Sequence, residues 1–459
     1  MKFYDGVFMK IIIVGAGTVG TVICTQLAIE GHDITLIDHN TQVLTELSNK
    51  FDIIGVEGNG ASVSTLRKAG ADKAELLIAV TNQDELNILC CASAKKLGTK
   101  NTVARVRNPE YNELMQMLKQ DLNLSLTINP ELAVAKEISR MLRFPFATKI
   151  DTCYRGRVEL AEFVIGEGSS LCGMPLSQLH AKIGLHFLFC GVVRNGEAYI
   201  PKGDFALAVG DKVCVTAPDD VMMQFFKAIG AYKHPVKDVL IVGGGRMTYY
   251  LLSFLQKNKI RSTVIEPDKQ RCRELAEHFD CNVIREDGTN QSVLKEEGIA
   301  QTDAFIALSG EDEENAIVSL YAKTQKTKKI ITLINAMQYV ELFKGVGLDS
   351  IVSPKYSTSN EILRYVRSLE VTKDIEIESL HKLMDDNFEA LECVIKEPVE
   401  GITGIPLKQL KLRRDVLIAT IVHKDKITIP SGNDMITSGD TVILFTSGVE
   451  INDIKDILK

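Results

Sequence analysis

Continuous apolar runs alternate along the chain with segments whose apolar residues recur every three or four positions. The run from residue 10 to residue 14 has the length of a strand, and Val19, Val22, Ile23 and Leu27 then follow at helical spacing. A short continuous run indicates a buried strand, whereas the second spacing indicates an amphipathic helix. Further strand-like runs lie at residues 34–37, 53–56, 76–80 and 102–106. Strands that alternate with helices predict a doubly wound α/β lobe around a parallel sheet.

A glycine-rich turn separates the first predicted strand from the first predicted helix. It runs from Gly15 to Gly20 in the pattern Gly-x-Gly-x-x-Gly, and Asp38 closes the next apolar run. We expect Gly15 to permit a tight turn, Gly17 to admit a pyrophosphate, and Gly20 to let the helix approach its strand. The N-terminus of the helix would offer unpaired N–H groups to a phosphate. This arrangement favours a nucleotide site over a turn that only ends a strand.

The acid after the second predicted strand limits which nucleotide would bind. The carboxylate of Asp38 can accept hydrogen bonds from ribose hydroxyls, and its charge would repel a 2′-phosphate. Asp38 therefore favours NAD(H) over NADP(H). It suits the ribose of ATP or ADP equally well, so both classes of nucleotide stay open.

The first hundred or so residues return 228 positions later without a gap. Gly15 and Gly17 become Gly243 and Gly245, and the predicted helix face stays apolar at every equivalent position. A repeat of this length predicts two Rossmann-like doubly wound lobes rather than one large sheet.

The second copy departs from the first at three positions near the predicted site. Thr248 stands in place of Gly20, Leu333 in place of Arg105, and Arg246 in place of Thr18. We expect the closest helix–strand packing to be lost or reorganised in the second copy. One cation disappears with Arg105, and Arg246 could supply that charge instead. The sequence thus predicts two unequal sites, the first more responsive to multiply charged nucleotides.

Several polar residues and glycines lie at the carboxyl ends of the predicted strands, where ligands bind in such sheets. In the first copy these are Asn59, Gly60, Thr81 and Arg105. Arg105 could pair with a phosphate, or it could be an ordinary surface arginine. Asp84, Glu85 and Asn87 follow Thr81 and recur in the second copy; they could cap a helix, or serve an interface or an ion.

Two later helices are predicted to begin at a proline. Asn129-Pro130 and Ser353-Pro354 each place an N-cap residue before a proline at the first helical position. We interpret each helix as a crossover between partners. Small α+β modules follow, and Asn195-Gly196 predicts a two-residue hairpin in the first of them. The predicted domains are nucleotide lobes at 9–150 and 236–368, and small modules at 151–232 and 369–459.

Composition removes several classes of function. The 459 residues carry a net charge of −7 with no long basic block, so we expect no nucleic-acid partner. Ten cysteines without a Cys-x-x-Cys pair, and eight scattered histidines, indicate reduced thiols and no metal site. No apolar run approaches the roughly 18 residues of a membrane span, which leads us to expect a cytoplasmic protein. Residues 1–8 precede a second methionine, and we interpret them as an extension or alternative start.

The sequence resembles the TrkA family of Trk-system potassium uptake regulators, which are built from tandem RCK domains (regulators of potassium conductance). The resemblance rests on the stretch from Met9 to Gly17, on 79–81 with Asp84, Glu85 and Asn87, and on 104–106 with 108–111. It covers residues 9–459 and includes the order of the modules, because each RCK N-lobe is followed by a small RCK C-lobe.

The resemblance implies a regulatory subunit without enzymatic activity. It implies NAD(H) as cofactor, with ATP or ADP as alternative ligands, and a TrkH-like membrane potassium-transport subunit as partner. It further implies a homo-tetrameric ring attached peripherally to the inner face of the plasma membrane. The first site would comprise Gly15, Ala16, Gly17, Thr18, Val19, Gly20, Asp38, Asn59, Gly60, Thr81 and Arg105. The second would comprise Gly243, Gly244, Gly245, Arg246, Met247, Glu266, Asp287, Gly288 and Ser309.

Two alternatives share the glycine pattern. An NAD-dependent oxidoreductase would need an acid or base facing the nicotinamide, and neither small module contains an obvious catalytic cluster. An RCK regulator of a different cation channel or exchanger would share all the motifs named above.

Overall fold

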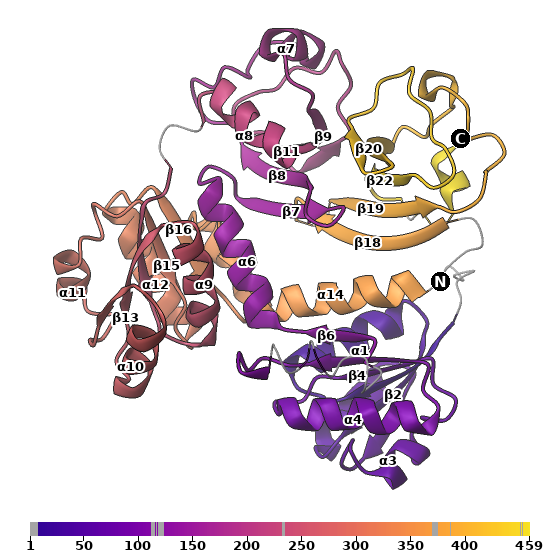
Figure 1. Cartoon of the computed structure of the whole chain (residues 1–459), viewed down its shortest axis with the longest axis vertical. Coiled ribbons are helices and arrows are strands. Elements are labelled where there is room, and N and C mark those ends of the chain that lie inside the picture. Colours follow the sequence, from indigo (N-terminus) through magenta and orange to yellow (C-terminus); the bar gives the residue numbers. More distant parts are fainter. Residues whose placement is uncertain are drawn as a thin grey trace.

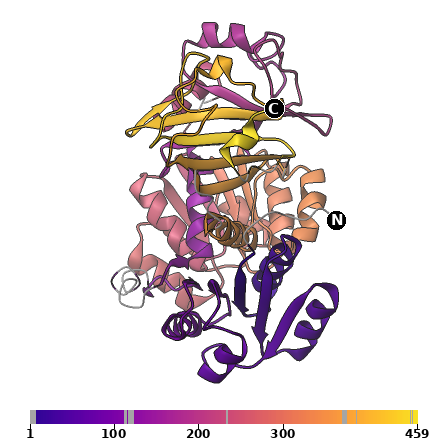
Figure 2. The same cartoon turned by 90° about the vertical axis from the view of Figure 1, so that its right-hand side faces the viewer.

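The described part of the chain forms two parallel and two antiparallel β-sheets, and each parallel sheet precedes an antiparallel one (Figure 1). A computed structural model describes residues 8–111, 115, 117, 124–231, 235–369, 375–385, 387–449, 451 and 453–459. Figures 1 and 2 show the two antiparallel sheets together at one end of the molecule. Of the predicted extension 1–8, the structure describes only Phe8.

The first parallel sheet has the strand order β3-β2-β1-β4-β5-β6. Residues 11–14 of β1 are all buried, because helices cover both faces of the sheet. The sixth strand, β6, was not predicted, since three residues are too few to produce a periodic signal. The strands are β1 (Lys10–Val14), β2 (Asp33–Asp38), β3 (Ile53–Glu57), β4 (Leu76–Ala79), β5 (Asn101–Arg105) and β6 (Leu126–Ile128); the helices are α1 (Thr18–Ile29), α2 (Thr41–Lys50), α3 (Val63–Lys68), α4 (Asp84–Leu97) and α6 (Pro130–Arg143).

The second parallel sheet repeats this order as β14-β13-β12-β15-β16-β17. The prediction of two doubly wound lobes is therefore confirmed. Its strands are β12 (Asp238–Val242), β13 (Arg261–Ile265), β14 (Asn282–Ile284), β15 (Ala304–Ala307), β16 (Lys329–Leu333) and β17 (Ile351–Val352); its helices are α9 (Arg246–Lys257), α10 (Lys269–His278), α11 (Gln291–Glu296), α12 (Asp312–Thr324), η1 (Met337–Tyr339), α13 (Val340–Gly345) and α14 (Pro354–Leu369).

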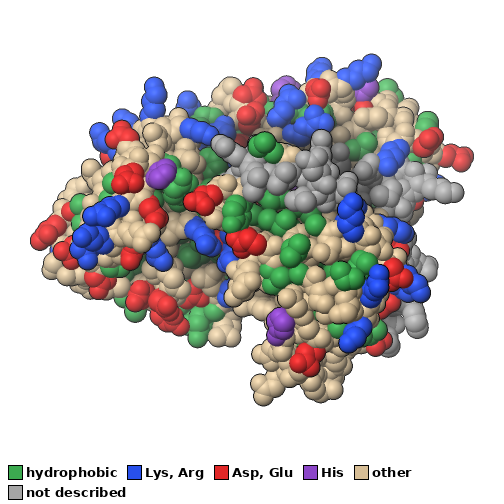
Figure 3. Space-filling model, turned by 60° about the horizontal axis from the view of Figure 1, so that its bottom comes forward, with side chains coloured by type: hydrophobic (Ala, Val, Ile, Leu, Met, Phe, Trp, Pro, Cys, Tyr) green, Lys and Arg blue, Asp and Glu red, His purple; other side chains and the backbone are tan. Residues whose placement is uncertain are grey.

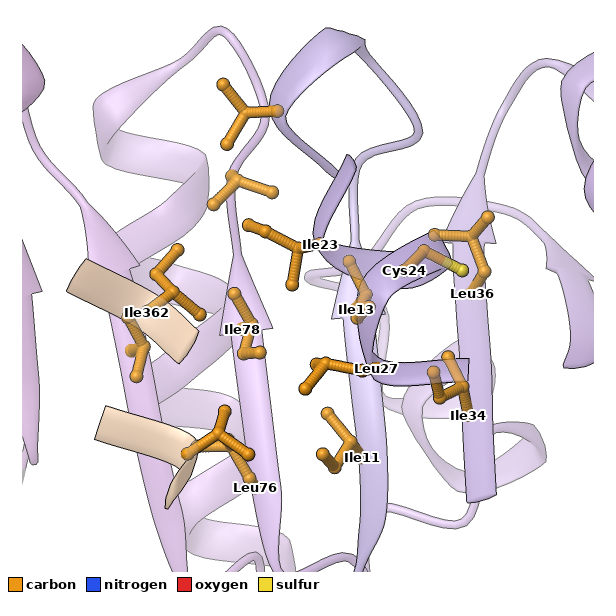
Figure 4. Close-up of a cluster of buried hydrophobic side chains, with 14 of the residues drawn as sticks. Ile11, Ile13, Ile23, Cys24, Leu27, Ile34, Leu36, Leu76, Ile78 and Ile362 are labelled. Carbon is orange, nitrogen blue, oxygen red and sulfur yellow. The ribbon is translucent and has the colours of Figure 1, made fainter. Parts of the chain in front are cut away.

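The helix that ends each parallel lobe packs on the other lobe of the same chain. Ile138 and Met141 of α6 join a core with Leu251 of the second lobe, while Ile362 of α14 joins the core of the first. Figure 4 shows Ile362 next to Ile78 of β4. The predicted crossover thus connects the two halves of one chain, and both helices lie at the centre of the molecule (Figure 1).

The two antiparallel sheets are also related by the repeat, with orders β10-β9-β11-β8-β7 and β18-β19-β22-β20-β21. Asn195 and Gly196 have φ of 55° and 83° and join β9 to β10, which confirms the predicted hairpin. The first module contains β7 (Lys149–Cys153), β8 (Val158–Val164), α7 (Leu176–Ile183), β9 (Leu188–Arg194), β10 (Glu197–Tyr199), β11 (Lys212–Pro218) and α8 (Asp219–Ala228). The second contains β18 (Ile375–Leu383), β19 (Phe388–Ile395), η2 (Leu407–Gln409), β20 (Val416–His423), β21 (Lys426–Thr428), β22 (Thr441–Thr446) and η3 (Ile454–Ile457).

Reciprocal hydrogen bonds hold the two small modules together. Glu162 of the first accepts a hydrogen bond from the backbone N–H of Met384 at 2.8 Å, and Glu392 of the second accepts one from the N–H of Tyr154 at 3.1 Å. Both carboxylates are buried, and a shared apolar core surrounds them. The halves of the chain therefore pair like two subunits of a symmetric dimer.

Candidate functional site

Both glycine turns open into one cleft between the two parallel lobes. The cleft has a volume of about 2210 Å³, and residues of both lobes line it. Each turn lies at the point where its sheet reverses strand order, next to the carboxyl ends of the central strands. The sequence predicted two unequal sites, one in each lobe, and the structure places both around a common space.

Glycine is required at two positions of the first turn. Gly15 has a φ of +103°, and a Cβ there would lie 3.0 Å from the backbone nitrogen of Thr81. A Cβ at Gly20 would overlap the carbonyl oxygen of Gly15, which confirms the close helix–strand contact expected of this residue. Asp38 accepts a hydrogen bond from the N–H of Ala16 at 2.6 Å and so ties the turn to the end of β2.

The second turn follows the same path with different side chains. Gly243 has a φ of +101°, and Glu266 accepts a hydrogen bond from the N–H of Gly244 at 2.6 Å. Thr248, at the position of Gly20, is fully buried, and its hydroxyl donates to the carbonyl of Gly243 at 2.5 Å. The packing that we expected to be lost or reorganised is reorganised around this hydrogen bond.

The acid and the turn have changed together between the lobes. A Cβ at Gly244 would lie 2.9 Å from Cγ of Glu266. The first lobe has the shorter Asp38 and can therefore hold the methyl group of Ala16 at the equivalent position. Glu266 is 3% exposed, so the acid of the second lobe is the more enclosed of the two.

Two helices begin at these turns without a side-chain cap. Gly17 is the N-cap of α1 and Gly245 the N-cap of α9, and no described side chain accepts a hydrogen bond from the first turn of either helix. A Cβ at either glycine would meet no atom within 4 Å, so open space lies in front of both. Unpaired N–H groups and the positive end of the helix dipole suit a phosphate at each position.

Arginines from both lobes surround one buried acid in the cleft. Burial lowers the pKa of Arg105, and neighbouring Arg107 lowers it further. Burial raises the pKa of Glu131, at the start of α6, while Arg107, Arg105 and Arg246 counteract that rise. Nε of Arg105 and Oε2 of Glu131 are buried, and neither has a hydrogen-bond partner among the described residues. Arg105 is therefore not an ordinary surface arginine, and this region retains unmet capacity for a polar ligand.

Residues after Thr81 brace the loops of the first lobe. Asn87 accepts from the N–H of Thr81 at 2.8 Å and donates to the carbonyl of Arg105 at 2.9 Å. Asp84 accepts from the N–H groups of Arg107 and Asn108, both at 2.8 Å. Asp312 and Asn315 repeat both sets of contacts in the second lobe. Contacts within each lobe thus explain the recurrence of the aspartate and the asparagine, and neither interpretation from sequence had included them.

The structure brings nearly all predicted site residues to the cleft. Gly20 and Gly60 are the two exceptions, because a Cβ at Gly20 would meet Gly15, and one at Gly60 would meet Val14. Both glycines serve packing and do not line the cleft. Arg107 and Glu131 were missed, although Arg107 lies two positions beyond Arg105 and Glu131 directly follows the predicted start of α6. The remaining predicted residues line the cleft: Gly15, Ala16, Gly17, Thr18, Val19, Asp38, Asn59, Thr81, Arg105, Gly243, Gly244, Gly245, Arg246, Met247, Glu266, Asp287, Gly288 and Ser309.

The residues that the structure describes contain no group of three His, Cys, Asp or Glu side chains arranged to hold a metal ion. No helix within them has both the length and the apolar character needed to cross a membrane. Lysine, arginine, aspartate and glutamate are interspersed over the face shown in Figure 3.

Sequence comparison accounts for both halves of the chain. The TrkA-N domain profile matches residues 11–126 and 239–354, and the TrkA-C domain profile matches residues 160–230 and 398–459. A Trk system potassium uptake protein TrkA homolog from Archaeoglobus fulgidus is 31% identical over 454 residues, 98% of this chain and 100% of the relative. The chain belongs to the TrkA family.

Solved structures similar to this TrkA-family chain include the GsuK RCK domain, with a TM-score of 0.62 at 17% identity, covering 97% of this chain and 94% of that one. The GsuK channel bound to NAD has a TM-score of 0.63 at 17% identity, covering 97% of this chain and 78% of that one. GsuK bound to ADP has a TM-score of 0.50 at 13% identity, covering 79% and 70% of the two chains. At these identities the likeness establishes the fold, which is that of paired RCK domains.

Proposed function

We propose that this chain is the nucleotide-sensing regulatory subunit of a Trk-type potassium uptake system. The observation that carries the proposal is the single cleft into which two uncapped helix N-termini point, in a chain of the TrkA family. NAD(H) and ATP or ADP are the proposed ligands, since the similar GsuK structures are described as bound to NAD and to ADP.

Different residues of the cleft would hold different parts of the nucleotide. The N-terminus of α1 and the guanidinium of Arg105 would hold phosphates, and the carboxylate of Asp38 would hold ribose hydroxyls. Arg246 is exposed in the cleft, and its charge lowers the pKa of Glu131 in the first lobe, after the larger raising effect of burial. A phosphate bound near Glu131 would therefore interact with arginines from both lobes.

Regulation follows from this shared position. A ligand shifts a conformational equilibrium only if it binds one state more tightly than another. Moving a gate from mostly closed to mostly open takes about 5.5 kcal/mol of differential affinity. Each site typically contributes about 1–3 kcal/mol, so several sites per assembly suffice. Since α6 and α14 join the cleft to the small modules, a change in lobe spacing would reach those modules directly.

The remaining assignments belong to the same proposal. The partner is a TrkH-like membrane potassium-transport subunit, and the regulator is a homo-tetramer attached to the inner face of the plasma membrane. The domain boundaries 9–150, 151–232, 236–368 and 369–459 remain predictions. No catalytic group is assigned, because gating requires no covalent chemistry.

Potassium flux tests this function. The chain is added to vesicles that contain the membrane subunit with which it co-purifies, and flux is measured with ADP, ATP, NAD or NADH. We expect the flux to depend on the nucleotide only when the chain is present. A deletion strain that imports potassium normally would contradict the proposal, and steady NADH turnover with carbonyl substrates would favour an oxidoreductase instead.

A further inference from the structure

A second cavity lies between the two crossover helices and the antiparallel sheets. Its volume is about 530 Å³, within the range of roughly 300–1,000 Å³ that is usual for small-molecule sites. It shares no lining residue with the nucleotide cleft. Helix α6, helix α14, and strands β7 and β18 each contribute to its wall.

Three acids line this cavity, Glu137, Asp151 and Glu361, and each has partners within the protein. Asp151 lies 2.9 Å from Nζ of Lys149 and 3.6 Å from Nδ1 of His381. Burial alone would raise the pKa of Asp151, but Lys149 and His381 together lower it well below its usual value. Glu137 accepts a hydrogen bond from Ser357 at 3.4 Å, and burial raises its pKa to about 7.

Three cations of the same cavity form no ion pair of this kind with the residues that the structure describes. Lys136 and Arg140 are one helical turn apart, so they lie on the same face of α6. Lys382 lines the cavity from β18, in the other half of the chain. No carboxylate among the described residues forms an ion pair with any of these three side chains. The charge of Arg140 acts on Glu137 and lowers its pKa, after the larger raising effect of burial. With Lys149, four cationic side chains line the cavity against three carboxylates, so the net charge of its lining is positive.

We propose that this cavity binds a compact, multiply charged anion that carries phosphate groups, held by Lys136, Arg140 and Lys382. Arg143, at the C-terminal end of α6, already lies 3.1 Å from Glu159 of β8. An anion between α6 and β18 would add a second tether, from the middle of the helix to the other small module. The site is a second regulatory input, and it does not depend on nucleotide binding in the cleft.

The experiment requires that phosphate binding in the cleft be blocked first. Gly17→Asp and Gly245→Asp do this, because a Cβ at either position meets no atom within 4 Å. Both residues have ordinary extended backbone, with φ of −69° and −74°. Aspartate is a favourable N-cap and repels phosphate, so the double variant should fold with both turns closed to anions.

Calorimetric titration with inorganic pyrophosphate and, separately, with ADP provides the test. We expect the blocked variant to bind one pyrophosphate per chain. Adding Arg140→Ala or Lys382→Ala should weaken that binding about tenfold or more, as expected for loss of a charge-assisted hydrogen bond. Lys68→Ala, which removes an exposed charge on α3, is the matched control and should change nothing. ADP binding that follows the same pattern would identify a nucleotide, rather than an inorganic anion, as a ligand of this cavity.

A variant of opposite sign separates binding from folding. Glu137→Gln removes a negative charge and should strengthen pyrophosphate binding, with less change between pH 6 and pH 8. The groups that face Glu137 are Lys136 and Arg140 on α6, Lys149 and Asp151 on β7, His381 and Lys382 on β18, and Ser357 and Glu361 on α14.

Two results would overturn the proposal: no pyrophosphate binding by the blocked variant, or binding that is unaffected by Arg140→Ala, Lys382→Ala and Glu137→Gln. Failure of the nucleotide proposal looks different, since wild type and blocked variant would then bind ADP equally.

Discussion

The two glycine turns have nearly the same backbone and different ways of closing it. Gly15 and Gly243 have φ of +103° and +101°, and in each lobe an acid holds the next N–H at 2.6 Å. In the first lobe, helix α1 packs directly against the turn because Gly20 has no side chain. The second lobe closes the turn through the hydroxyl of Thr248. A nucleotide cradle therefore tolerates substitution where a neighbouring group supplies the missing contact or the missing space.

The lobes differ more in charge than in shape. Arg105 and Arg107 lie on the side of the first lobe, and Leu333 occupies the position of Arg105 in the second. Arg246 belongs to the second lobe, yet its charge acts on Glu131 and Glu85 of the first lobe, after the larger effects of their own burial or hydrogen bonds. Cations from both lobes thus converge on the first site, which supports the predicted inequality of the two sites.

The largest effect is expected from Gly20→Thr, which copies the residue of the second lobe into the first. A Cβ at position 20 would overlap the oxygen of Gly15 and lie 3.3 Å from Cγ2 of Val80. We expect a loss of about 3 kcal/mol or more in the free energy of unfolding, measured by urea denaturation and by hydrogen exchange of α1. The reverse change, Thr248→Gly, should cost only about 1–2 kcal/mol. Equal effects would mean that the two turns close in the same way.

Arg105→Ala should weaken binding of ADP or ATP to the first site by about 1.5–3 kcal/mol, because a hydrogen bond to a charged group is lost. Arg246→Ala should also weaken nucleotide binding to the first site, since the charges of Arg105 and Arg246 act on the same place, around Glu131. Titration calorimetry measures both variants, with Lys68→Ala on α3 as the control. Negligible losses of nucleotide affinity in both variants would contradict the prediction that the first site binds multiply charged nucleotides more strongly.

Gly244→Ala tests whether turn and acid depend on each other. The new methyl group would press on Cγ of Glu266 at 2.9 Å, and we expect a loss of about 1–3 kcal/mol in unfolding free energy. Adding Glu266→Asp restores the combination found in the first lobe and should recover part of that loss. A double-mutant cycle measures the coupling, and strictly additive effects would contradict it.

Lys329→Asn should change the pH dependence of stability. Burial lowers the pKa of Lys329 from 10.5 to about 7, and Asn101 occupies its position in the first lobe. Between these two pH values the unfolded chain binds more protons than the folded one, so stability rises with pH through this window. From pH 7 to pH 8 the rise attributable to Lys329 is about 1 kcal/mol. Denaturation series at both pH values should show a smaller rise in the variant.

Local sequence patterns predicted the helices and strands of the fold, but not which lobe each crossover helix packs against. Strand runs and helical spacing located both lobes, and Asn195-Gly196 located a hairpin, because those signals depend on neighbouring residues. The apolar face of α6 reveals that the helix is buried, without revealing which lobe buries it. The exchange of α6 and α14 depends on contacts between residues such as Ile138 and Leu251, more than a hundred positions apart.

The candidate site was predictable to the same extent. Glycines and acids at strand ends follow from the fold, so almost every named residue reached the cleft. The merging of two sites into one space could not be predicted, since it results from the packing of one lobe against the other. Glu131 entered the site for that reason, since it lies at the start of α6, which packs on the second lobe. Arg107 follows β5 of the first lobe, two positions beyond the predicted Arg105.

The central claim is that one cleft holds two unequal nucleotide cradles. Binding isotherms of ADP to the wild type, to Gly17→Asp and to Gly245→Asp test it most directly. We predict two ADP molecules per chain with different affinities, and selective loss of the tighter one in Gly17→Asp. Two identical sites, or isotherms unchanged by both substitutions, would contradict the account.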